Sequence, residues 1–149
     1  MTGRRGFTLI ELLTVTLVLG VLAGIALLKY LDLRNTARAA EVAGDFRAVT
    51  VAAFSYYADY DAWPPDGAAG APPPALQPYL PGGLRFTKPE YTLDFDNIGV
   101  GGGAYLVGVT VTSSNPDLMA RLIRNLGTAQ PYFAAGGALT YIIATPGGP

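Results

Sequence analysis

The N-terminal part of the chain contains the stretch FTLIELLTVTLVLGVLAGIALL, residues 7–28. Of these 22 residues, 16 are hydrophobic, and Glu11 carries the only charge. As an α-helix with a rise of about 1.5 Å per residue, the stretch would be ~33 Å long, enough to cross a hydrocarbon core of about 30 Å. The sequence therefore predicts a membrane-spanning helix over residues 7–28.

The residues on either side of this stretch set its expected orientation. Arg4 and Arg5 precede it, so the positive-inside rule places the N-terminus in the cytoplasm and the residues after Lys29 outside. A secretory signal peptide also starts with basic residues, but its apolar region spans about 7–15 residues and ends at a small-residue cleavage site. Here the apolar run is longer and passes directly into KYLDL, residues 29–33. We therefore expect a membrane anchor.

The composition of the whole chain excludes several classes of site. The 149 residues are 50% hydrophobic and 14% charged, and they include no cysteine and no histidine. This excludes disulfides, thiol nucleophiles, imidazole bases and Cys/His zinc sites. The net charge of -1 argues against a nucleic-acid partner, which would need clustered Lys and Arg. We therefore expect one domain outside the membrane that is not an enzyme.

Glu11 is an acid within the apolar stretch. A carboxylate near the bilayer centre costs roughly 2.5–3.5 kcal/mol, so it is expected to have a function and a partner. No Lys or Arg lies within one helical turn of it. Cleavage before Phe7 would create an α-ammonium four residues away, and the same group on a neighbouring copy could approach Glu11 within the membrane.

The residues RRGFTLIELL, 4–13, closely resemble the processing signal of type IV prepilins and pseudopilins. That signal is a short basic leader ending in Gly, followed by Phe and by Glu at the fifth mature position. The resemblance implies that a membrane aspartyl peptidase cleaves between Gly6 and Phe7 and methylates the new N-terminus. It also implies that Glu11 neutralises the Phe7 ammonium of an adjacent subunit during filament assembly. It covers about residues 4–30 and continues more loosely to Asp66.

One position departs from the family pattern. Many family members have a proline at the position of Leu28, where local melting of the helix lets subunits pack. Gly20 and Gly24 could weaken the helix instead, since each costs about 1 kcal/mol relative to Ala, and with Ala23 they form a small-residue face for close helix packing. The alternative is that these glycines are only tolerated in a membrane span. The missing proline favours a minor or atypical subunit.

The helical pattern continues beyond the membrane. An apolar stripe with spacings of three and four comprises Ala39, Val42, Phe46, Val49, Ala53, Tyr56 and Tyr60. The charged residues that fall largely off this stripe are Arg38, Glu41, Asp45 and Arg47. Pro64 and Gly67 should end the helix by WPPDG, residues 63–67. We expect one helix from Phe7 to about Tyr60, ~80 Å long, which suits a filament of stacked subunits better than a compact domain.

The remainder of the chain predicts a small sheet. Residues 63–83 contain seven prolines and four glycines and should form an extended loop. Strands are predicted over residues 91–95 and 104–112 around a glycine-rich turn at 99–103. A short amphipathic helix should follow Ser114-Asn115-Pro116-Asp117, pass through Leu118, Leu122, Ile123 and Leu126 and stop at Gly127, and a hairpin with a Gly136-Gly137 turn should span 132–144.

The expected fold class is α+β. The outer half of a long N-terminal helix should pack on about four antiparallel strands, which agrees with the pilin fold that the N-terminus implies. Four segments are expected: a leader peptide, residues 1–6; a transmembrane or filament-core helix, 7–28; an amphipathic helix, 29–62; and a head domain, 63–149.

Two groups of acidic residues could bind a metal. Asp94, Asp96 and Asn97 present oxygen ligands at a spacing similar to that of a calcium loop, and Asp59, Asp61 and Asp66 bracket the end of the long helix. Neither group matches a complete calcium loop, and alternating Asp on a strand usually marks its solvent face. We expect no cofactor, with calcium as the alternative, since some major pseudopilins bind calcium in C-terminal loops.

The sequence thus predicts a structural subunit of a type IV filament: a pilus, a type II secretion pseudopilus or a competence filament. The family resemblance implies other pilin-like subunits, a prepilin peptidase, an assembly ATPase and a platform protein as partners. It also implies an inner-membrane precursor with its head outside the cytoplasm, and then an extracellular or periplasmic filament. The alternative is a membrane-anchored periplasmic binding or enzymatic domain with a pilin-like N-terminus.

Overall fold

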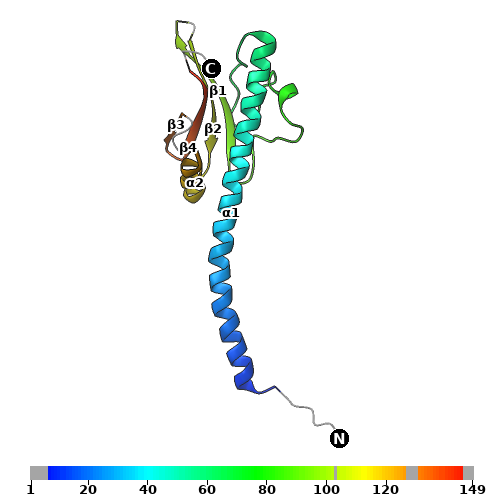
Figure 1. The fold of residues 1–149 in the computed structure, drawn as a ribbon, viewed down its shortest axis with the longest axis vertical. Helices are drawn as coiled ribbons and strands as arrows, with labels where there is room; N and C mark the ends of the chain where they lie inside the picture. The colour runs from blue at the N-terminus through cyan, green and yellow to red at the C-terminus, as the bar shows by residue number, and fades with distance from the viewer. Residues whose placement is uncertain (1–6, 103, 127–130, 146–149) are drawn as a thin grey trace. The chain divides into compact units, whose positions relative to one another are not determined.

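The computed structural model describes residues 7–102, 104–126 and 131–145. The chain divides into two compact units, Met1–Asn35 and Thr36–Pro149. The described part of the first unit is helical from Leu9 onwards, and the second unit holds the remainder of that helix, a sheet and a shorter helix (Figure 1). The leader, residues 1–6, lies outside the described residues.

Helix α1 runs without interruption from Leu9 to Tyr60. The prediction of one long helix ending near Tyr60 is confirmed, and neither Gly20 nor Gly24 breaks it. The helix ends because Asp61 adopts a left-handed conformation, with φ at 51°. The Asp61 N–H still donates to the Tyr57 carbonyl at 2.8 Å, which completes the last turn before the chain reaches its prolines.

The sheet has four antiparallel strands in the order β1-β2-β4-β3. They are β1 (Thr92–Gly101), β2 (Ala104–Thr112), β3 (Tyr132–Ala135) and β4 (Ala138–Ala144). The prediction of about four strands with a final hairpin at one edge is confirmed. The first predicted strand was too short, because β1 stays paired with β2 through the glycine-rich segment as far as Gly101.

Helix α2, Pro116–Leu126, follows β2 where the sequence predicts a short helix. The Asn115 side-chain carbonyl accepts hydrogen bonds from the backbone N–H groups of Asp117 at 3.1 Å and Leu118 at 3.3 Å. Asn115 is therefore the N-cap, with proline in the first helical position, where its missing N–H costs nothing. The predicted stop at Gly127 lies outside the described residues.

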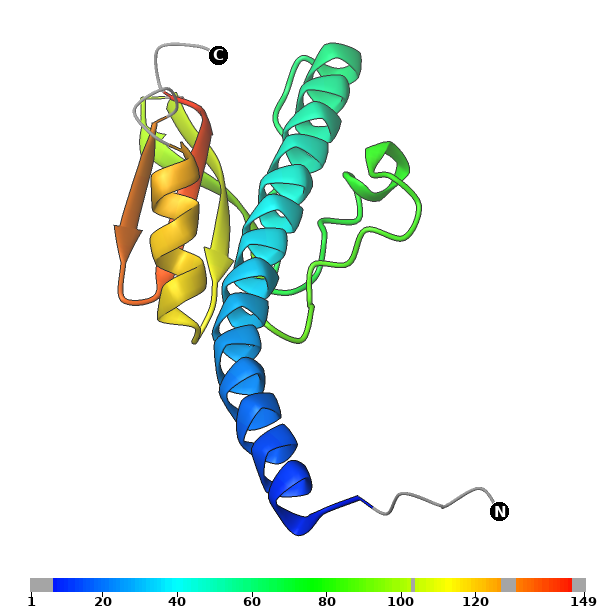
Figure 2. The same cartoon turned by 60° about the horizontal axis from the view of Figure 1, so that its bottom comes forward.

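The proline-rich loop between α1 and β1 lies along the outer edge of the sheet. The N–H groups of Gly67 and Gly70 donate to the carbonyls of Phe95 and Leu93, at 3.1 and 2.8 Å. These bonds satisfy the free edge of β1, which would otherwise expose unpaired backbone groups. A short 3-10 helix, Gln77–Tyr79, lies further along the loop, and this part of the loop is on the side of α1 away from the sheet (Figure 2).

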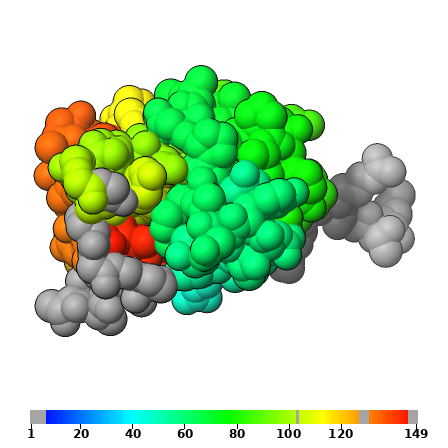
Figure 3. All heavy atoms as spheres, turned by 90° about the horizontal axis from the view of Figure 1, so that it is seen from above, coloured from blue at the N-terminus to red at the C-terminus, as the bar shows by residue number. Residues whose placement is uncertain are grey.

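One hydrophobic core holds the second unit together. Phe46 on α1 stacks on Tyr141 of β4, with ring centroids 5.5 Å apart. The fully buried residues of this core come from α1, the loop, the sheet and α2: Val42, Val49, Leu76, Phe86, Leu93, Phe95, Val107, Val109, Val111, Leu118, Leu122 and Leu139. A space-filling view from above shows the end of α1 and the loop, in teal and green, packed directly beside the strands (Figure 3).

The predicted apolar stripe of α1 is correct over most of its length but wrong at two places. Ala39, Val42, Phe46, Val49 and Ala53 are buried, as the prediction requires. Tyr60 is 62% exposed, because it lies at the last turn of α1 and packs on the Tyr56 ring at 4.6 Å rather than on the sheet. Asp45, expected off the stripe, is only 8% exposed.

Candidate functional site

The N-terminus of α1 is capped by the side chains of two neighbouring residues, Thr8 and Glu11. Thr8 precedes the first helical residue, Leu9, and Glu11 is the third residue of the helix. The Glu11 carboxylate oxygen Oε2 accepts hydrogen bonds from the Thr8 backbone N–H at 2.9 Å and from the Thr8 hydroxyl at 2.7 Å. The Thr8 hydroxyl oxygen in turn accepts from the Glu11 N–H at 3.4 Å. This reciprocal arrangement is a capping box.

The capping box gives Glu11 a partner within its own chain. The negative charge of Glu11 lies at the positive end of the helix dipole. The Glu11 carboxylate also accepts from the Thr8 N–H, which has no acceptor within the helix. We missed this role in the sequence, although the signal was present: Thr8 and Glu11 have the T-x-x-E spacing of a capping box. Phe7, the predicted mature N-terminus, is exposed immediately before Thr8, and Gly6 lies outside the described residues.

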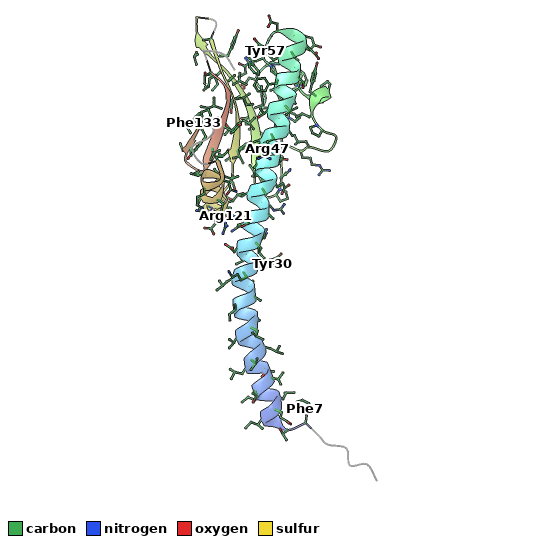
Figure 4. All side chains as sticks on the ribbon, viewed as in Figure 1. Phe7, Tyr30, Arg47, Tyr57, Arg121 and Phe133 are labelled. Carbon is green, nitrogen blue, oxygen red and sulfur yellow. The ribbon has the colours of Figure 1, made fainter. Side chains whose placement is uncertain are left out.

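The first unit presents an apolar surface on all sides. Every described residue from Phe7 to Arg34 is exposed, and the side chains from Phe7 to Tyr30 stand off the helix all round (Figure 4). A methyl group added at Gly20 or Gly24 would meet no atom within 4 Å. By length and composition α1 contains a segment able to cross a membrane. A helix that is hydrophobic all round needs lipid or other helices to cover it.

A second polar site lies on the outer half of α1, where four residues form the Lys88 cluster: Lys88, Asp45, Glu41 and Tyr91. Lys88 Nζ donates to Asp45 Oδ2 at 2.6 Å and to Glu41 Oε1 at 2.9 Å. The Tyr91 hydroxyl donates to the same Asp45 oxygen at 2.7 Å. Because Asp45 and Glu41 are four residues apart on α1, both carboxylates lie on one side of the helix and face the loop that carries Lys88.

The electrostatics of the Lys88 cluster favour its ionised form. Burial lowers the pKa of Lys88, but its hydrogen bonds to Asp45, Tyr91 and Glu41 outweigh this effect and raise the pKa above its ordinary value. Hydrogen bonds from Lys88 and Arg38 lower the pKa of Glu41. Burial and the hydrogen bond to Asp45 raise the pKa of Tyr91, so its hydroxyl remains a donor. The charged Lys88 thus fastens the loop to α1 through its bonds to Asp45 and Glu41.

The predicted calcium ligands do not converge. Asp94 and Asp96 lie on one face of β1, and Asn97 lies on the other, because side chains alternate along a strand. The Asn97 amide donates to the Pro64 carbonyl at 2.7 Å, and its backbone N–H donates to Asp66 at 3.0 Å. Asp96 accepts from Thr110.

The second acidic group is also divided. Asp59 accepts a hydrogen bond from the Tyr79 hydroxyl, whereas Asp66 lies beside β1.

Asp94, in the first acidic group, has a pKa above its ordinary value. Burial raises it, and so do the nearby charges of Asp96 and Asp66. In the part of the chain that the structure describes, no three acidic side chains are grouped closely enough to hold a metal ion. The expectation of no cofactor, with calcium as the alternative, therefore stays a prediction.

Comparisons with known proteins bear on the N-terminal residues. Residues 1–27 match the family model of the prokaryotic N-terminal methylation motif. The chain is 38% identical over 78 residues to the type IV major pilin protein PilE1 of Neisseria gonorrhoeae, a match covering 50% of this chain and 35% of that protein. Over these 78 residues the chain is similar in sequence to a type IV pilin. The predicted resemblance of its N-terminus to prepilins is therefore confirmed.

Other comparisons give three further matches. The fimbrial protein EcpC of Eikenella corrodens is 39% identical over 66 residues, which cover 44% of the chain and 43% of that protein. Residues 34–80 match a family model described as PilW, C-terminal. The major type IV pilin PilA1 of Clostridium difficile is similar in structure, with a TM-score of 0.47 and 21% identity, over 73% of this chain and 96% of that one. The matches span less than half the length of either curated relative.

Proposed function

We propose that this chain is a structural subunit of a type IV filament, assembled through the N-terminal half of α1. The observation that carries the proposal is the N-terminal methylation motif over residues 1–27, which runs into a segment, Phe7–Arg34, whose residues are all exposed and mostly apolar. Such a surface is stable in a bilayer and, after extraction, against other helices of the same kind. The homologous relatives are named as pilin and fimbrial proteins.

Processing precedes assembly in this proposal. A prepilin peptidase on the cytoplasmic side cleaves between Gly6 and Phe7 and methylates the new Phe7 amine. The precursor is held in the inner membrane by residues 7–28, with residues 29–149 outside the cytoplasm, and it then joins an extracellular or periplasmic filament. An assembly ATPase and a membrane platform protein drive that step.

Glu11 has two roles in the proposal. In the single chain it closes the capping box with Thr8, so its carboxylate is already hydrogen-bonded before assembly. In the filament it neutralises the Phe7 ammonium of the adjacent subunit, which would otherwise bury an unpaired charge. A capped but ionised Glu11 suits both roles, because a carboxylate can accept several hydrogen bonds at once.

The proposal is tested by expressing the full chain in cells with and without an active prepilin peptidase. We expect the chain in the sheared surface or filament fraction only when the peptidase is active, and as a slower-migrating membrane form when it is not. A chain that migrates identically in both strains and never leaves the membrane fraction would contradict the proposal and favour a simple membrane-anchored domain.

A further inference from the structure

Helix α1 begins just beyond the bond at which cleavage is proposed, the bond between Gly6 and Phe7. Its first hydrogen bond runs from the Leu12 N–H to the Thr8 carbonyl at 3.3 Å, so Thr8 is the N-cap. Phe7 lies outside the helix and is 77% exposed (Figure 4). The regular helix therefore stops short of the Gly6–Phe7 bond.

The capping box occupies the N–H groups that a longer helix would need. If α1 began one turn earlier, the Glu11 N–H would donate to the Phe7 carbonyl. The Thr8 N–H would donate to the Arg4 carbonyl, because each helical bond spans four residues. In the structure the Glu11 N–H donates to the Thr8 hydroxyl oxygen, and the Thr8 N–H donates to the Glu11 carboxylate. The two side chains thus replace the carbonyls that would carry the helix across the Gly6–Phe7 bond.

A helix across this bond would hinder its hydrolysis. Hydrolysis places a hydroxyl from water on the Gly6 carbonyl carbon and a proton on the Phe7 nitrogen as the bond between them breaks. In a longer helix the Gly6 carbonyl would instead accept from the Ile10 N–H. Peptide-binding sites commonly take a segment in extended form, because its backbone groups are then free to bond. A substrate that is helical at this bond must first unwind.

We infer that Thr8 is a positioning residue for cleavage. Its hydroxyl fixes the start of α1 at Leu9 and keeps the Gly6–Phe7 bond outside the helix, where a peptidase can bind it. Thr8 acts through the Glu11 N–H and not through contact with the reacting atoms. The inference rests on the proposed function, which supplies the cleavage.

The apolar surroundings of the segment strengthen this effect. A backbone N–H that loses its partner in a bilayer costs more than one in water, so it takes an acceptor from its own chain. Without the Thr8 hydroxyl, the acceptor that helix geometry offers to the Glu11 N–H is the Phe7 carbonyl. Its use would lengthen the helix toward the cleaved bond.

Thr8 carries more of this role than Glu11. The Thr8 hydroxyl accepts from a backbone N–H, so this bond survives when the Glu11 side chain is replaced by alanine. The Glu11 carboxylate adds the bond from the Thr8 N–H. Glu11→Ala should therefore slow cleavage less than loss of the Thr8 hydroxyl does.

Two other threonines of α1 provide matched controls. The Thr14 hydroxyl donates to the Ile10 carbonyl at 2.7 Å. The Thr16 hydroxyl donates to the Leu13 carbonyl at 2.9 Å. Both bonds lie within the helix and leave its start unchanged. Thr14→Val and Thr16→Val thus remove a hydroxyl from the same apolar segment without disturbing the cap.

Rates of cleavage of the full-length precursor by a prepilin peptidase in detergent micelles test the inference. Thr8→Val keeps the shape of the side chain but removes the cap. Thr8→Asn changes the shape but restores a capping acceptor, since asparagine is among the best N-cap residues. We expect Thr8→Val to lower kcat/KM by at least about threefold and Thr8→Asn to stay within about twofold of wild type. The controls at Thr14 and Thr16 should match wild type.

The separate kinetic parameters distinguish positioning from a direct role in the reaction. If the peptidase binds only precursors with an extended bond, Thr8→Val should raise KM and leave kcat unchanged, because the competent fraction of substrate falls. Equal rates for all variants, a lower kcat for Thr8→Val, or Thr8→Asn as slow as Thr8→Val would overturn the inference. The proposed function would stand, because the wild-type chain would still be cleaved. A wild-type chain that is not cleaved between Gly6 and Phe7 would overturn both.

Discussion

Lys88 Nζ lies 2.6 Å from Asp45 Oδ2, and this ion pair joins two segments that are 43 residues apart in the sequence. It fixes the proline-rich loop on α1 at a point where the helix is otherwise packed by apolar residues. Tyr91 adds a second donor to the same carboxylate oxygen. The ion pair therefore holds the end of the loop against α1 shortly before β1 begins.

Lys88→Met should destabilise the second unit by about 3 kcal/mol, because it leaves the buried Asp45 carboxylate without its cation. Adding Asp45→Asn should recover part of the loss, since removing both charges leaves neither one unpaired. Urea denaturation of the full chain in detergent micelles measures both, with the single tryptophan, Trp63, as the probe. Arg85→Met, at an exposed position, serves as the control. Equal midpoints for wild type and Lys88→Met would show that the ion pair is dispensable.

Asp94→Asn should make the second unit more stable at neutral pH, by less than about 1 kcal/mol because the group is partly exposed. The folded-state pKa of Asp94 is raised, so its ionised form is penalised in the folded chain at neutral pH. As the pH falls through that pKa, the folded wild type takes up the proton first and gains stability. The advantage of the variant should therefore shrink in acid. Denaturation midpoints between pH 7 and about pH 3 test this, and an advantage that grows in acid would contradict it.

Gly70→Ala should cost about 2 kcal/mol of folding stability, because Gly70 has a φ of 83° and an added methyl group would clash with the Thr87 hydroxyl oxygen. Gly82→Ala is the matched control on the same loop. Its φ is not positive, and its added methyl group would meet nothing within 4 Å. Thermal unfolding compares the two variants. The explanation fails if both lose the same stability.

Glu11→Ala should leave cleavage after Gly6 largely intact but reduce filament yield, because the charge opposite the neighbouring Phe7 amine is lost. Glu11→Gln separates the two roles of this residue, since its amide oxygen can still accept from Thr8 although the charge is gone. If charge pairing is required, the Gln variant should assemble as poorly as the Ala variant. Wild-type filament yield from Glu11→Gln would assign the role of Glu11 to the capping box alone.

The elements of this fold were predictable where the signals are local. Asn115 and the following proline mark the start of α2, and Gly136 and Gly137, both with positive φ, mark the last hairpin. The end of α1 was predictable from Pro64, which restricts the backbone before it. Each of these signals acts within a few residues, so the elements could be predicted without knowing the tertiary structure.

The interactions that fasten the loop were not predictable, because nothing in the sequence links Lys88 to Asp45. The charge of Asp45 placed it off the apolar stripe, and only the folded chain brings it the partners that make its burial possible. The capping box at the start of α1 was not predicted either, for a different reason. Thr8 and Glu11 have its T-x-x-E spacing, which is a local signal that the sequence alone contains.

Mass spectrometry of the mature N-terminus decides whether this chain is processed as a filament subunit. We expect a chain that begins at Phe7, lacks residues 1–6 and carries one added methyl group on its amine, in both membrane and filament fractions. An intact Met1, or cleavage at any bond other than Gly6–Phe7, would contradict the assignment of this chain as a processed filament subunit.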